Sequence, residues 1–387
     1  MMKKLKSVIV GGLALVLAIS LVAGACAPVE VPEEIAKLEA EIADLEDDVA
    51  AEKTKTAAEK AKVSDLEKEI TALKKPAEVF EWRVQTAHPA AALAHTLFVE
   101  FTEKLEEASD GRVVITPFAA GDIVPTFETF DSIVAGVIEG DLTGSVYWSG
   151  KDPAFMLLSA MPGDPTEVWQ QDAWYWEGGG IELARELYGE YGIYYIAPFS
   201  LGAESIHFKD PVRTLDDFDG VKIRTIAGIT AEFFEKLGCS VVLLPGGEVL
   251  TALGTGVIDA FEYGDPATNW PVGFHEVTDY FVYPAAHAPN SIWNFDVSVT
   301  AWNELPADLQ AIVETTAREG NANTWYSSLI ATMEAIDNLI AYGNERIFWS
   351  EEMYAQQREM GLELWDAWPD QSPMFVKLVE SKKAFMK

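Results

Sequence analysis

Residues 213–262 read RTLDDFDGVKIRTIAGITAEFFEKLGCSVVLLPGGEVLTALGTGVIDAFE, and this stretch decides the fold class. Two short runs rich in β-branched residues, Val221–Arg224 and Val241–Leu244, predict strands. Between and after them, Ile229–Leu237 and Glu248–Leu253 have the apolar spacing of amphipathic helices. Because strands and helices alternate, the stretch predicts an α/β fold with helices packed on a largely parallel sheet.

The same alternation continues on both sides of this stretch, from Pro76 to the end of the chain. We therefore expect a working domain over residues 77–387. Its further predicted strands are Glu81–Gln85, Val113–Pro117 and Ile292–Val299, and its further predicted helices are Ala91–Ala108, Phe127–Ile138 and Pro306–Asn338.

Composition and charge narrow the class of partner. The chain has 387 residues, of which 49% are hydrophobic, enough for a large folded core. Its formal net charge is -34 at pH 7. Nucleic acids and anionic lipid surfaces are bound through clustered Lys and Arg, so the sequence predicts no nucleic-acid partner.

The first 26 residues have the pattern of a bacterial export signal. Three lysines precede the apolar run Val8–Val22, which is short for a membrane span, and residues 23–25 are small. Cys26 follows and resembles the cysteine of a lipobox, although Ala23 stands where lipoboxes usually carry Leu. The pattern predicts a signal peptide over 1–25 and a lipidated Cys26, hence an extracytoplasmic lipoprotein anchored to the membrane in the periplasm or at the cell surface. A plainly cleaved signal and an uncleaved anchor are the alternatives.

Residues 26–76 carry a charged heptad pattern. Apolar residues recur at spacings of three and four in two blocks, Ile35–Val49 and Val63–Leu73. The core positions between the blocks are polar: Glu52, Thr56 and Glu59. We expect one helix over Glu33–Lys75, about 65 Å long at 1.5 Å per residue, that forms a coiled-coil stalk. The alternative is a coiled coil that joins copies of the chain into a homo-oligomer.

Enzyme signatures are mostly absent from the sequence. It has no Gly-x-Ser-x-Gly elbow, no Walker loop, no two-histidine zinc motif and no dinucleotide-binding glycine pattern between a strand and a helix. Besides Cys26 there is Cys239, and its apolar surroundings, Phe233–Leu244, predict a buried and unreactive thiol. The chain is therefore expected not to be an enzyme.

The stretch quoted above resembles the solute-binding subunits of tripartite ATP-independent periplasmic (TRAP) transporters. The resemblance extends more weakly over residues 80–387 and rests on Leu215-Asp216-Asp217, Lys222-Ile223-Arg224, Leu237-Gly238, Pro245, Glu248, Thr251-Ala252-Leu253 and Gly256-Val257-Ile258-Asp259. It implies capture of a small organic acid and its delivery to the TRAP membrane subunits. It also implies a two-lobed periplasmic-binding-protein-like fold with a hinge, in which lobe I is about 77–200 and 290–330 and lobe II is about 201–289 and 331–387.

Arg224 is the strongest candidate binding residue. It ends a predicted strand beside a turn that contains glycine, which places a guanidinium at the carboxyl edge of the sheet, where open α/β folds bind ligands. The resemblance implies that Arg224 forms the salt bridge to the substrate carboxylate, whose two oxygens match its forked donors. A structural ion pair is the alternative.

Glu262-Tyr263 resembles the glutamate and aromatic pair of the TRAP subgroup that binds 2-oxo or 2-hydroxy acids with a metal ion. The resemblance implies that Glu262 helps to hold a Na⁺ or Ca²⁺ ion or the far end of the ligand. The glutamine of that subgroup has no clear counterpart, since the nearest alignment falls on Ala203 or Glu204, and Glu204 offers oxygen ligands of its own. Side chains expected either in the pocket wall or in core packing are Tyr147, Trp148, Trp174, Trp270 and His287.

Two other functions fit the same residues. Glu204 and Glu262 would serve as the acid and base of a carboxylate-dependent enzyme such as a lyase or glycosidase. A domain presented on a stalk would also suit the ligand-sensing partner of a membrane receptor. Turnover assays distinguish the first alternative from a binding protein, and uptake assays distinguish the second.

Overall fold

The computed structural model describes residues 30–51, 57–73, 78–165, 167–368 and 371–386. It divides into two compact units, residues 1–78 and 79–387, each of which is described by itself. The predicted signal peptide and Cys26 lie outside the described residues. In the part of the chain that is described, no helix is both long and apolar enough to cross a membrane.

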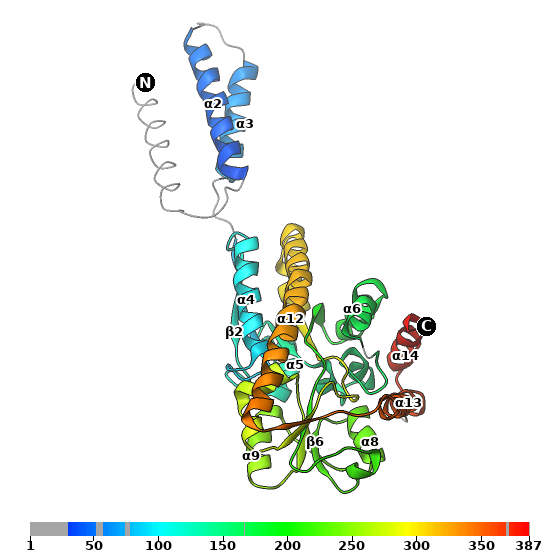
Figure 1. Ribbon diagram of the computed structural model, residues 1–387. Coiled ribbons are helices and arrows are strands. Elements are labelled where there is room, and N and C mark those ends of the chain that lie inside the picture. Colours follow the sequence, from blue (N-terminus) through cyan, green and yellow to red (C-terminus); the bar gives the residue numbers. More distant parts are fainter. Residues whose placement is uncertain (1–29, 52–56, 74–77, 166, 369–370, 387) are drawn as a thin grey trace. The chain divides into compact units, whose positions relative to one another are not determined.

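The N-terminal unit consists of α2 (Glu30–Ala51) and α3 (Ala57–Leu73), which lie side by side (Figure 1). Leu66 and Ile70 are buried, and Lys62 Nζ lies 2.8 Å from Glu41 Oε1. The prediction of one continuous helix over residues 33–75 is therefore wrong. The polar core positions divide the apolar stripe into two halves, and these halves pack against each other within one chain. The coiled-coil stalk and its role in oligomer formation stay predictions.

The first lobe of the second unit is built on a sheet with the strand order β2-β1-β3-β10-β4. Its strands are β1 (Phe80–Thr86), β2 (Val113–Phe118), β3 (Gly140–Thr143), β4 (Ile193–Ser200) and β10 (Ile292–Ser298). Its helices are α4 (Leu93–Ala108), α5 (Thr129–Val134), α6 (Val168–Glu177), α7 (Gly180–Gly189) and α11 (Val299–Glu304). Phenylalanines of α4, β4 and β10 pack together between helix and sheet: Phe98, Phe101, Phe199 and Phe295.

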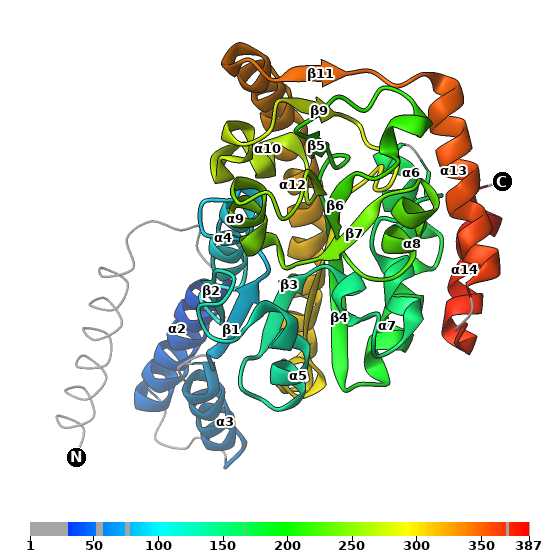
Figure 2. The same ribbon diagram turned by 90° about the horizontal axis from the view of Figure 1, so that it is seen from below.

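The second lobe is built on a sheet with the strand order β11-β9-β5-β8-β6-β7 (Figure 2). Its strands are β5 (Ile206–Phe208), β6 (Lys222–Thr225), β7 (Ser240–Leu243), β8 (Ala260–Glu262), β9 (Tyr280–Val282) and β11 (Glu345–Ile347). Its helices are α8 (Ile229–Lys236), α9 (Val249–Gly254) and α10 (Pro266–Asn269), and α13 (Glu351–Ala367) packs on α8.

Each sheet is largely parallel, as the sequence predicts, and contains one strand that runs against the others. β5 is antiparallel to β8 and β9, and β10 is antiparallel to β3 and β4. The chain passes from the first sheet to the second between β4 and β5, and it returns between β9 and β10. A parallel neighbour requires a crossover connection, usually a helix, whereas strands that enter a sheet directly from the other lobe pair in the antiparallel direction.

The long helix α12 (Ala307–Tyr342) contacts both lobes. It packs on β4 and α4 of the first lobe and on α10 and β11 of the second (Figure 1). Where the chain crosses after β4, the side chain of Asn321 accepts a hydrogen bond from the main-chain N–H of Ser200 at 2.8 Å. Two turns further along the same face of α12, Ser328 Oγ accepts a hydrogen bond from the main-chain N–H of Gly202 at 3.0 Å. These bonds satisfy buried backbone donors at the crossing, so α12 supports the connection between the lobes.

The C-terminal helix α14 (Pro373–Phe385) packs against the first lobe, whereas the sequence predicts it in the second lobe. It packs on the short 3₁₀ helix η3 (Pro153–Leu158) and on α7, which both lie with the first sheet (Figure 2). A buried ion pair, Lys382 Nζ to Asp164 Oδ1 at 2.8 Å, fixes this contact. The assignment of all of residues 331–387 to the second lobe is therefore wrong, because the apolar face of a helix predicts burial but not the lobe that covers it.

Cys239 precedes β7 and is buried, with 8% of its surface exposed. Its Sγ donates to the main-chain oxygen of Phe218 at 3.4 Å. Burial raises the pKa of the thiol to about 12, so the thiolate does not form near neutral pH. The predicted burial of this thiol is confirmed.

Candidate ligand-binding site

Arg224 and Glu262 meet at one edge of the second sheet. Arg224 lies near the carboxyl end of β6, and Glu262 ends β8. The two strands are parallel neighbours, with Arg224 beside Phe261 in the register. Because the carboxyl ends of parallel neighbours lie at the same edge, the local sequence brings the two charged side chains together.

Glu204 and His287 lie at the same edge of the sheet, one just before a strand and the other after a neighbouring antiparallel strand. Glu204 comes shortly before β5, which is antiparallel to β8, so the start of β5 lies beside the end of β8. His287 follows β9, which is antiparallel to β5 and therefore runs in the direction of β8. Strand topology thus gathers two acids, an arginine and a histidine that are far apart in the sequence.

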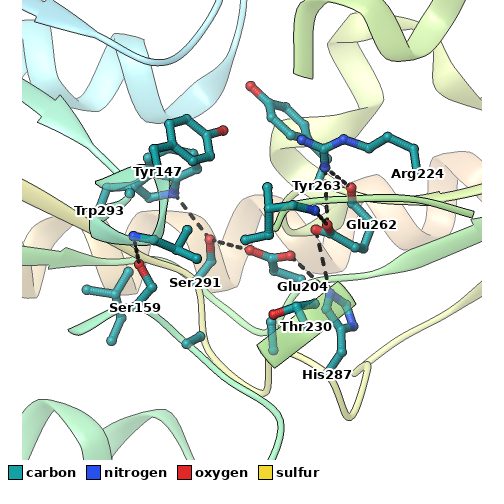
Figure 3. Close-up of a pocket in the computed structure, with 16 residues that line it drawn as sticks. Tyr147, Ser159, Glu204, Arg224, Thr230, Glu262, Tyr263, His287, Ser291 and Trp293 are labelled. Carbon is teal, nitrogen blue, oxygen red and sulfur yellow. Dashed lines mark hydrogen bonds and ion pairs between the residues drawn. The ribbon is translucent and has the colours of Figure 1, made fainter. Parts of the chain in front are cut away.

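The first lobe supplies the opposite wall. Tyr147 lies in the 3₁₀ helix η2 (Ser145–Trp148), directly after β3. Ser291 and Trp293 lie at the start of β10, which is antiparallel to β3, so they come to the edge at which β3 ends. Figure 3 shows Tyr147 and Trp293 on one side of the site and Arg224 with Glu262 on the other.

These side chains enclose a cavity of about 40 Å³ between the lobes (Figure 3). One buried water needs about 10–15 Å³ of such space, so the cavity admits the head group of a small molecule rather than a sugar chain or a peptide. The residues that line it are Gly144, Val146, Tyr147, Ser159, Ala160, Glu204, Arg224, Ile226, Thr230, Glu262, Tyr263, His287, Ala288, Ser291, Ile292 and Trp293.

Arg224 is fully buried but only partly paired. Its Nε donates to the main-chain oxygen of Leu244 at 2.9 Å. Its Nη1 donates to the main-chain oxygen of Glu262 and, at 3.3 Å, to Glu262 Oε1. Its Nη2 has no hydrogen-bond partner among the described residues. A buried donor without an acceptor costs about 1–3 kcal/mol or more, so Nη2 is suited to an anionic oxygen that enters the cavity.

His287 joins the two carboxylates. Its Nε2 lies 3.2 Å from Glu204 Oε2 and 3.8 Å from Glu262 Oε2. One ligand atom from each of the three residues lies within 4.8 Å of the other two. Burial raises the pKa of Glu204 to about 7, the hydrogen bond with His287 opposes this shift, and the nearby charge of Glu262 adds to it. The three side chains therefore offer a place for an additional positive charge.

A chain of hydrogen bonds orients Glu204 (Figure 3). Trp293 Nε1 donates to Ser291 Oγ at 3.2 Å, and Ser291 Oγ donates to Glu204 Oε1 at 3.1 Å. Because His287 contacts the other carboxylate oxygen, both oxygens of Glu204 are fixed in direction.

Tyr147 and Tyr263 supply neutral hydroxyl groups. Burial raises the pKa of Tyr147 to about 12, although the charge of Arg224 lowers it. Burial also raises the pKa of Tyr263, whose hydroxyl has no hydrogen-bond partner in the described part of the chain. The Tyr263 ring lies against Gly246, where a Cβ would come within 2.2 Å of its Cε2. Both phenols stay protonated near neutral pH, so each is available to donate to a ligand oxygen.

A family model for bacterial extracellular solute-binding proteins, family 7, matches residues 84–371. The chain belongs to this family. A relative from Nostoc sp., named a monocarboxylate 2-oxoacid-binding periplasmic protein, is 30% identical over 307 residues, which are 79% of this chain and 84% of the relative. The chain is thus an extracytoplasmic solute-binding protein of the TRAP type, as the sequence predicts.

Solved structures of family 7 proteins have the same two-lobed fold. A TRAP solute-binding protein from Pseudoalteromonas atlantica with bound sodium and pyruvate is 27% identical, with a TM-score of 0.72, covering 80% of this chain and 94% of that one. One from Rhodobacter sphaeroides, in an apo open structure, is 31% identical, with a TM-score of 0.64, covering 79% of this chain and 97% of that one.

The cavity brings together most of the site residues that the sequence predicts for this family 7 protein: Tyr147, Glu204, Arg224, Glu262, Tyr263 and His287. Trp148 and Trp174 do not line it, so their assignment to the pocket wall is wrong. Trp148 is buried in the core of the first lobe, and Trp174 Nε1 donates to Ser381 Oγ beneath α14 at 3.1 Å. Trp270, the further aromatic candidate, stacks on His275 at 3.9 Å between ring centroids.

Sequence reasoning missed the polar residues Ser159, Thr230 and Ser291 and the indole of Trp293. Ser291 and Trp293 begin a strand that the sequence does predict. They reach the site only because that strand is antiparallel to β3, and a single sequence gives no signal for strand direction.

Proposed function

We propose that this protein binds a small monocarboxylic acid with a second oxygen on the adjacent carbon, a 2-oxo or 2-hydroxy acid, and delivers it to TRAP membrane subunits. The observation that carries the proposal is Arg224 Nη2, a buried donor without a partner in a cavity the size of a small head group. The printed name of the Nostoc relative and the pyruvate bound by the Pseudoalteromonas protein support the same ligand class.

In this proposal the ligand carboxylate lies against Arg224. A guanidinium binds a carboxylate through two parallel N–H donors, and Nη2 is the donor that the protein leaves unpaired. The hydroxyls of Tyr147 and Tyr263 line the same cavity as neutral donors. Neutral donors stabilise an anionic oxygen through hydrogen bonds without adding charge to the site. Which anion binds then depends on the shape of the cavity.

Charge balance favours a cation at Glu204, Glu262 and His287. Arg224 offsets one buried carboxylate, and an anionic ligand adds another negative charge that the site must compensate. The carboxylate oxygens fit Na⁺ or Ca²⁺, which prefer oxygen ligands, whereas the imidazole nitrogen is a weaker match. When bound, such an ion would neutralise the acids and attract the second oxygen of the ligand.

Membrane attachment and delivery complete the proposal. Cys26 would carry a lipid, and residues 27–76 would tether the binding domain to the membrane surface. Ligand bridges the second lobe at Arg224 and the first lobe at Tyr147, so it binds the closed arrangement more tightly than an open one. The closed form would be the one that the membrane subunits recognise.

Calorimetry on the full chain in detergent tests this function. After treatment with a chelator, pyruvate is titrated alone, with Ca²⁺ and with Na⁺, and ribose and alanine are titrated under the same conditions. We expect pyruvate to bind, more tightly with one of the ions present, and the two neutral or zwitterionic compounds not to bind. Binding of ribose without binding of any 2-oxo or 2-hydroxy acid, with or without either ion, would contradict the proposal.

A further inference from the structure

Glu204 and Glu262 stand close together in the ligand site although both are acids. One oxygen of each, together with a ring nitrogen of His287, lies within 4.8 Å of the other two atoms. Like charges at such a separation repel each other. The backbone that carries the two acids must therefore be held in place by contacts outside the cluster.

The two acids belong to separate segments of the chain. Glu204 lies in the crossing segment, residues 201–205, which leads from β4 in the first sheet to β5 in the second. Glu262 ends β8, and Asp265 stands three residues later, at the start of α10. The main-chain N–H of Ser205 donates to the main-chain oxygen of Gly264 at 3.0 Å, so the two segments lie side by side. A contact that joins them determines the distance between the acids.

Ser328 on α12 joins these two segments through one hydroxyl group. Its Oγ accepts a hydrogen bond from the main-chain N–H of Gly202 at 3.0 Å, and the hydroxyl donates to Asp265 Oδ2. Gly202 precedes Glu204 by two residues, and Asp265 follows Glu262 by three. All three members of this link are buried where α10 packs on α12 (Figure 2).

Gly202 is also connected to the side chain of Glu204. The main-chain oxygen of Gly202 accepts from the N–H of Ser291 at 3.0 Å, and Ser291 Oγ donates to Glu204 Oε1 at 3.1 Å. A Cβ added to Gly202 would lie 3.9 Å from Asp265 Oδ2, so the crossing segment packs directly against this acid. A shift of Gly202 would therefore displace Glu204 through Ser291 as well as through the backbone.

Asp265 is fully buried and accepts three hydrogen bonds. Its Oδ1 accepts from the N–H of Thr268 at 2.8 Å, and its Oδ2 accepts from the hydroxyls of Ser328 and, at 3.2 Å, Thr332. No Lys, Arg or His in the described part of the chain forms an ion pair with it. The bond from Thr268 caps α10, a usual role of Asp at the start of a helix. Capping occupies Oδ1 alone, so it does not account for the two bonds from α12.

A comparable link ties the end of β4 to the first lobe. The main-chain N–H of Ser200 donates to Asn321 Oδ1 of α12 at 2.8 Å, and Asn321 Nδ2 donates to Asp172 Oδ1 of α6 at 2.6 Å. In both links a side chain of α12 connects a backbone N–H at the crossing with an acid. The first acid belongs to the first lobe and the second, Asp265, to the second lobe. The long helix thus fixes the crossing segment relative to both lobes.

We propose that Ser328 and Asp265 are positioning residues of the ligand site, which hold Glu204 and Glu262 at the separation that a bound cation requires. The inference rests on the proposed function, because it takes a cation to bind at these acids and to strengthen binding of the organic acid. Neither Ser328 nor Asp265 lines the cavity, so both act through the backbone. Groups that orient the ligands of a metal ion from outside typically change its affinity by about 10- to 100-fold.

Ser328→Ala and Thr332→Val test the inference on the full chain. Each substitution removes one α12 hydroxyl that donates to Asp265 Oδ2, but only Ser328 also contacts Gly202. Pyruvate is titrated by calorimetry without added ion and with Ca²⁺ or Na⁺, whichever strengthens wild-type binding. For Ser328→Ala we expect a loss of affinity of about tenfold or more with the ion and of less than about threefold without it. Thr332→Val should lose less than about threefold under both conditions.

Asp265→Asn reaches the same link from its other end. Asn caps a helix as well as Asp does, but its amide nitrogen cannot accept a hydrogen bond from the Ser328 hydroxyl. We expect the ion-dependent part of pyruvate binding to fall as it does in Ser328→Ala. Thermal unfolding of the ligand-free variants is measured alongside, because a role in folding alone would lower the melting temperature and leave the ion response of pyruvate binding unchanged.

The outcomes separate this inference from the proposed function. A Ser328→Ala variant that keeps the wild-type ion response, or that loses affinity equally with and without the ion, overturns the inference and leaves the proposed function standing. Wild-type binding of pyruvate that depends on neither ion also overturns the inference alone. If the wild type binds no 2-oxo or 2-hydroxy acid, the proposed function fails and this inference fails with it. If neither Ser328→Ala nor Asp265→Asn folds, the link serves folding and the inference is wrong.

Discussion

Arg224 Nη1 donates to both the main-chain oxygen and the carboxylate Oε1 of Glu262, while Arg224 Nη2 has no partner among the described residues. The Arg224 guanidinium therefore holds the protein together through Nε, which donates to the main-chain oxygen of Leu244, and through Nη1, and it leaves Nη2 available to a ligand. The structural ion pair and the ligand contact, which the sequence leaves as alternatives, are compatible roles of the same side chain.

Substitution of Arg224 should weaken ligand binding through the loss of this fork. Arg224→Lys keeps a positive charge beside Glu262 but provides no planar pair of donors, so we expect at least a tenfold loss of pyruvate affinity. Arg224→Ala should cost on the order of 2–5 kcal/mol of binding free energy, because the ligand carboxylate would be buried without its partner. It should also lower the melting temperature of the ligand-free protein, since Glu262 loses a buried donor.

Calorimetry with pyruvate and thermal unfolding of the ligand-free variants measure both effects. The matched control is Arg213→Lys, because the Arg213 side chain is 51% exposed and pairs with Glu345 at the surface. Pyruvate affinity of Arg224→Lys equal to that of Arg213→Lys would show that Arg224 acts in folding alone.

Glu204 should matter for cation dependence more than for folding. Glu204→Gln removes one negative charge from the three-residue cluster but keeps an oxygen that can accept from Ser291. If a cation is held there, its affinity should fall at least tenfold, and pyruvate binding should respond less to added Ca²⁺ or Na⁺. Ser291→Ala, which keeps the charge and loses only the hydrogen bond, should have a smaller effect. An unchanged ion response in Glu204→Gln, measured by calorimetry, would place the cation elsewhere or remove it from the site.

Sequence patterns predict the parts of the site that depend on local strand geometry. Arg224 follows an apolar strand and Glu262 ends another, and each stands where its strand reaches the cleft. Their meeting follows from parallel pairing, which the alternation of strands and helices indicates. Glu204 and His287 were predicted through resemblance and residue type, and their position depends on β5 and β9, whose antiparallel direction the sequence does not reveal.

The failed predictions share a physical cause. Trp148 and Trp174 have the residue type of pocket walls, but burial in a core requires the same large apolar surface, and a single sequence does not distinguish the two environments. The heptad pattern of residues 33–75 predicts helix correctly, yet apolar blocks of equal spacing pair within one chain as well as between chains. In both cases the pattern specifies that a face is buried and leaves the partner undetermined.

Cys26 lies outside the described residues, and its lipidation is a prediction from the export signal. Metabolic labelling with a fatty acid should mark the wild-type chain, and the chain should sediment with membranes. Cys26→Ser should lose the label and release the protein into the soluble extracytoplasmic fraction. A label that survives Cys26→Ser would show that the lipobox interpretation is wrong.

Removal of residues 27–76 should leave ligand affinity nearly unchanged. Contacts divide the chain into residues 1–78 and 79–387, and every residue that lines the ligand cavity belongs to the second unit. We expect pyruvate affinities of the full and shortened chains, both with Cys26, to agree within tenfold, which is about 1.4 kcal/mol. A larger loss in calorimetry would mean that the N-terminal unit takes part in binding.

Away from the ligand site, Asp141 on β3 and Asp296 on β10 lie directly opposite each other in the first sheet, and both are buried. Thr129 donates to Asp141 Oδ2, whereas the carboxyl group of Asp296 faces that of Asp141 and accepts no hydrogen bond from any other group among the described residues. Burial raises the pKa of Asp141 to about 7. Burial, the charge of Asp141 and a hydrogen bond between the two carboxyl groups raise the pKa of Asp296 well above its usual range. The pair therefore binds at least one proton at neutral pH that the unfolded chain releases.

This pair should make the protein less stable as pH rises. Between pH 4 and pH 7 or above, the folded protein binds more protons at these two acids than the unfolded chain does, so their contribution to the free energy of unfolding falls with increasing pH. Asp296→Asn keeps the shape of the side chain and removes one acid, and at pH 8 we expect it to stabilise the protein by on the order of 1–4 kcal/mol. Thermal unfolding of ligand-free protein from pH 5 to pH 8 should show the difference between variant and wild type increasing with pH, while the control Thr129→Val destabilises the protein and retains its pH dependence. A difference that is constant over this range, or that shrinks as pH rises, would mean that Asp141 and Asp296 are both ionised in the folded state or that their charge is compensated by a group outside the pair.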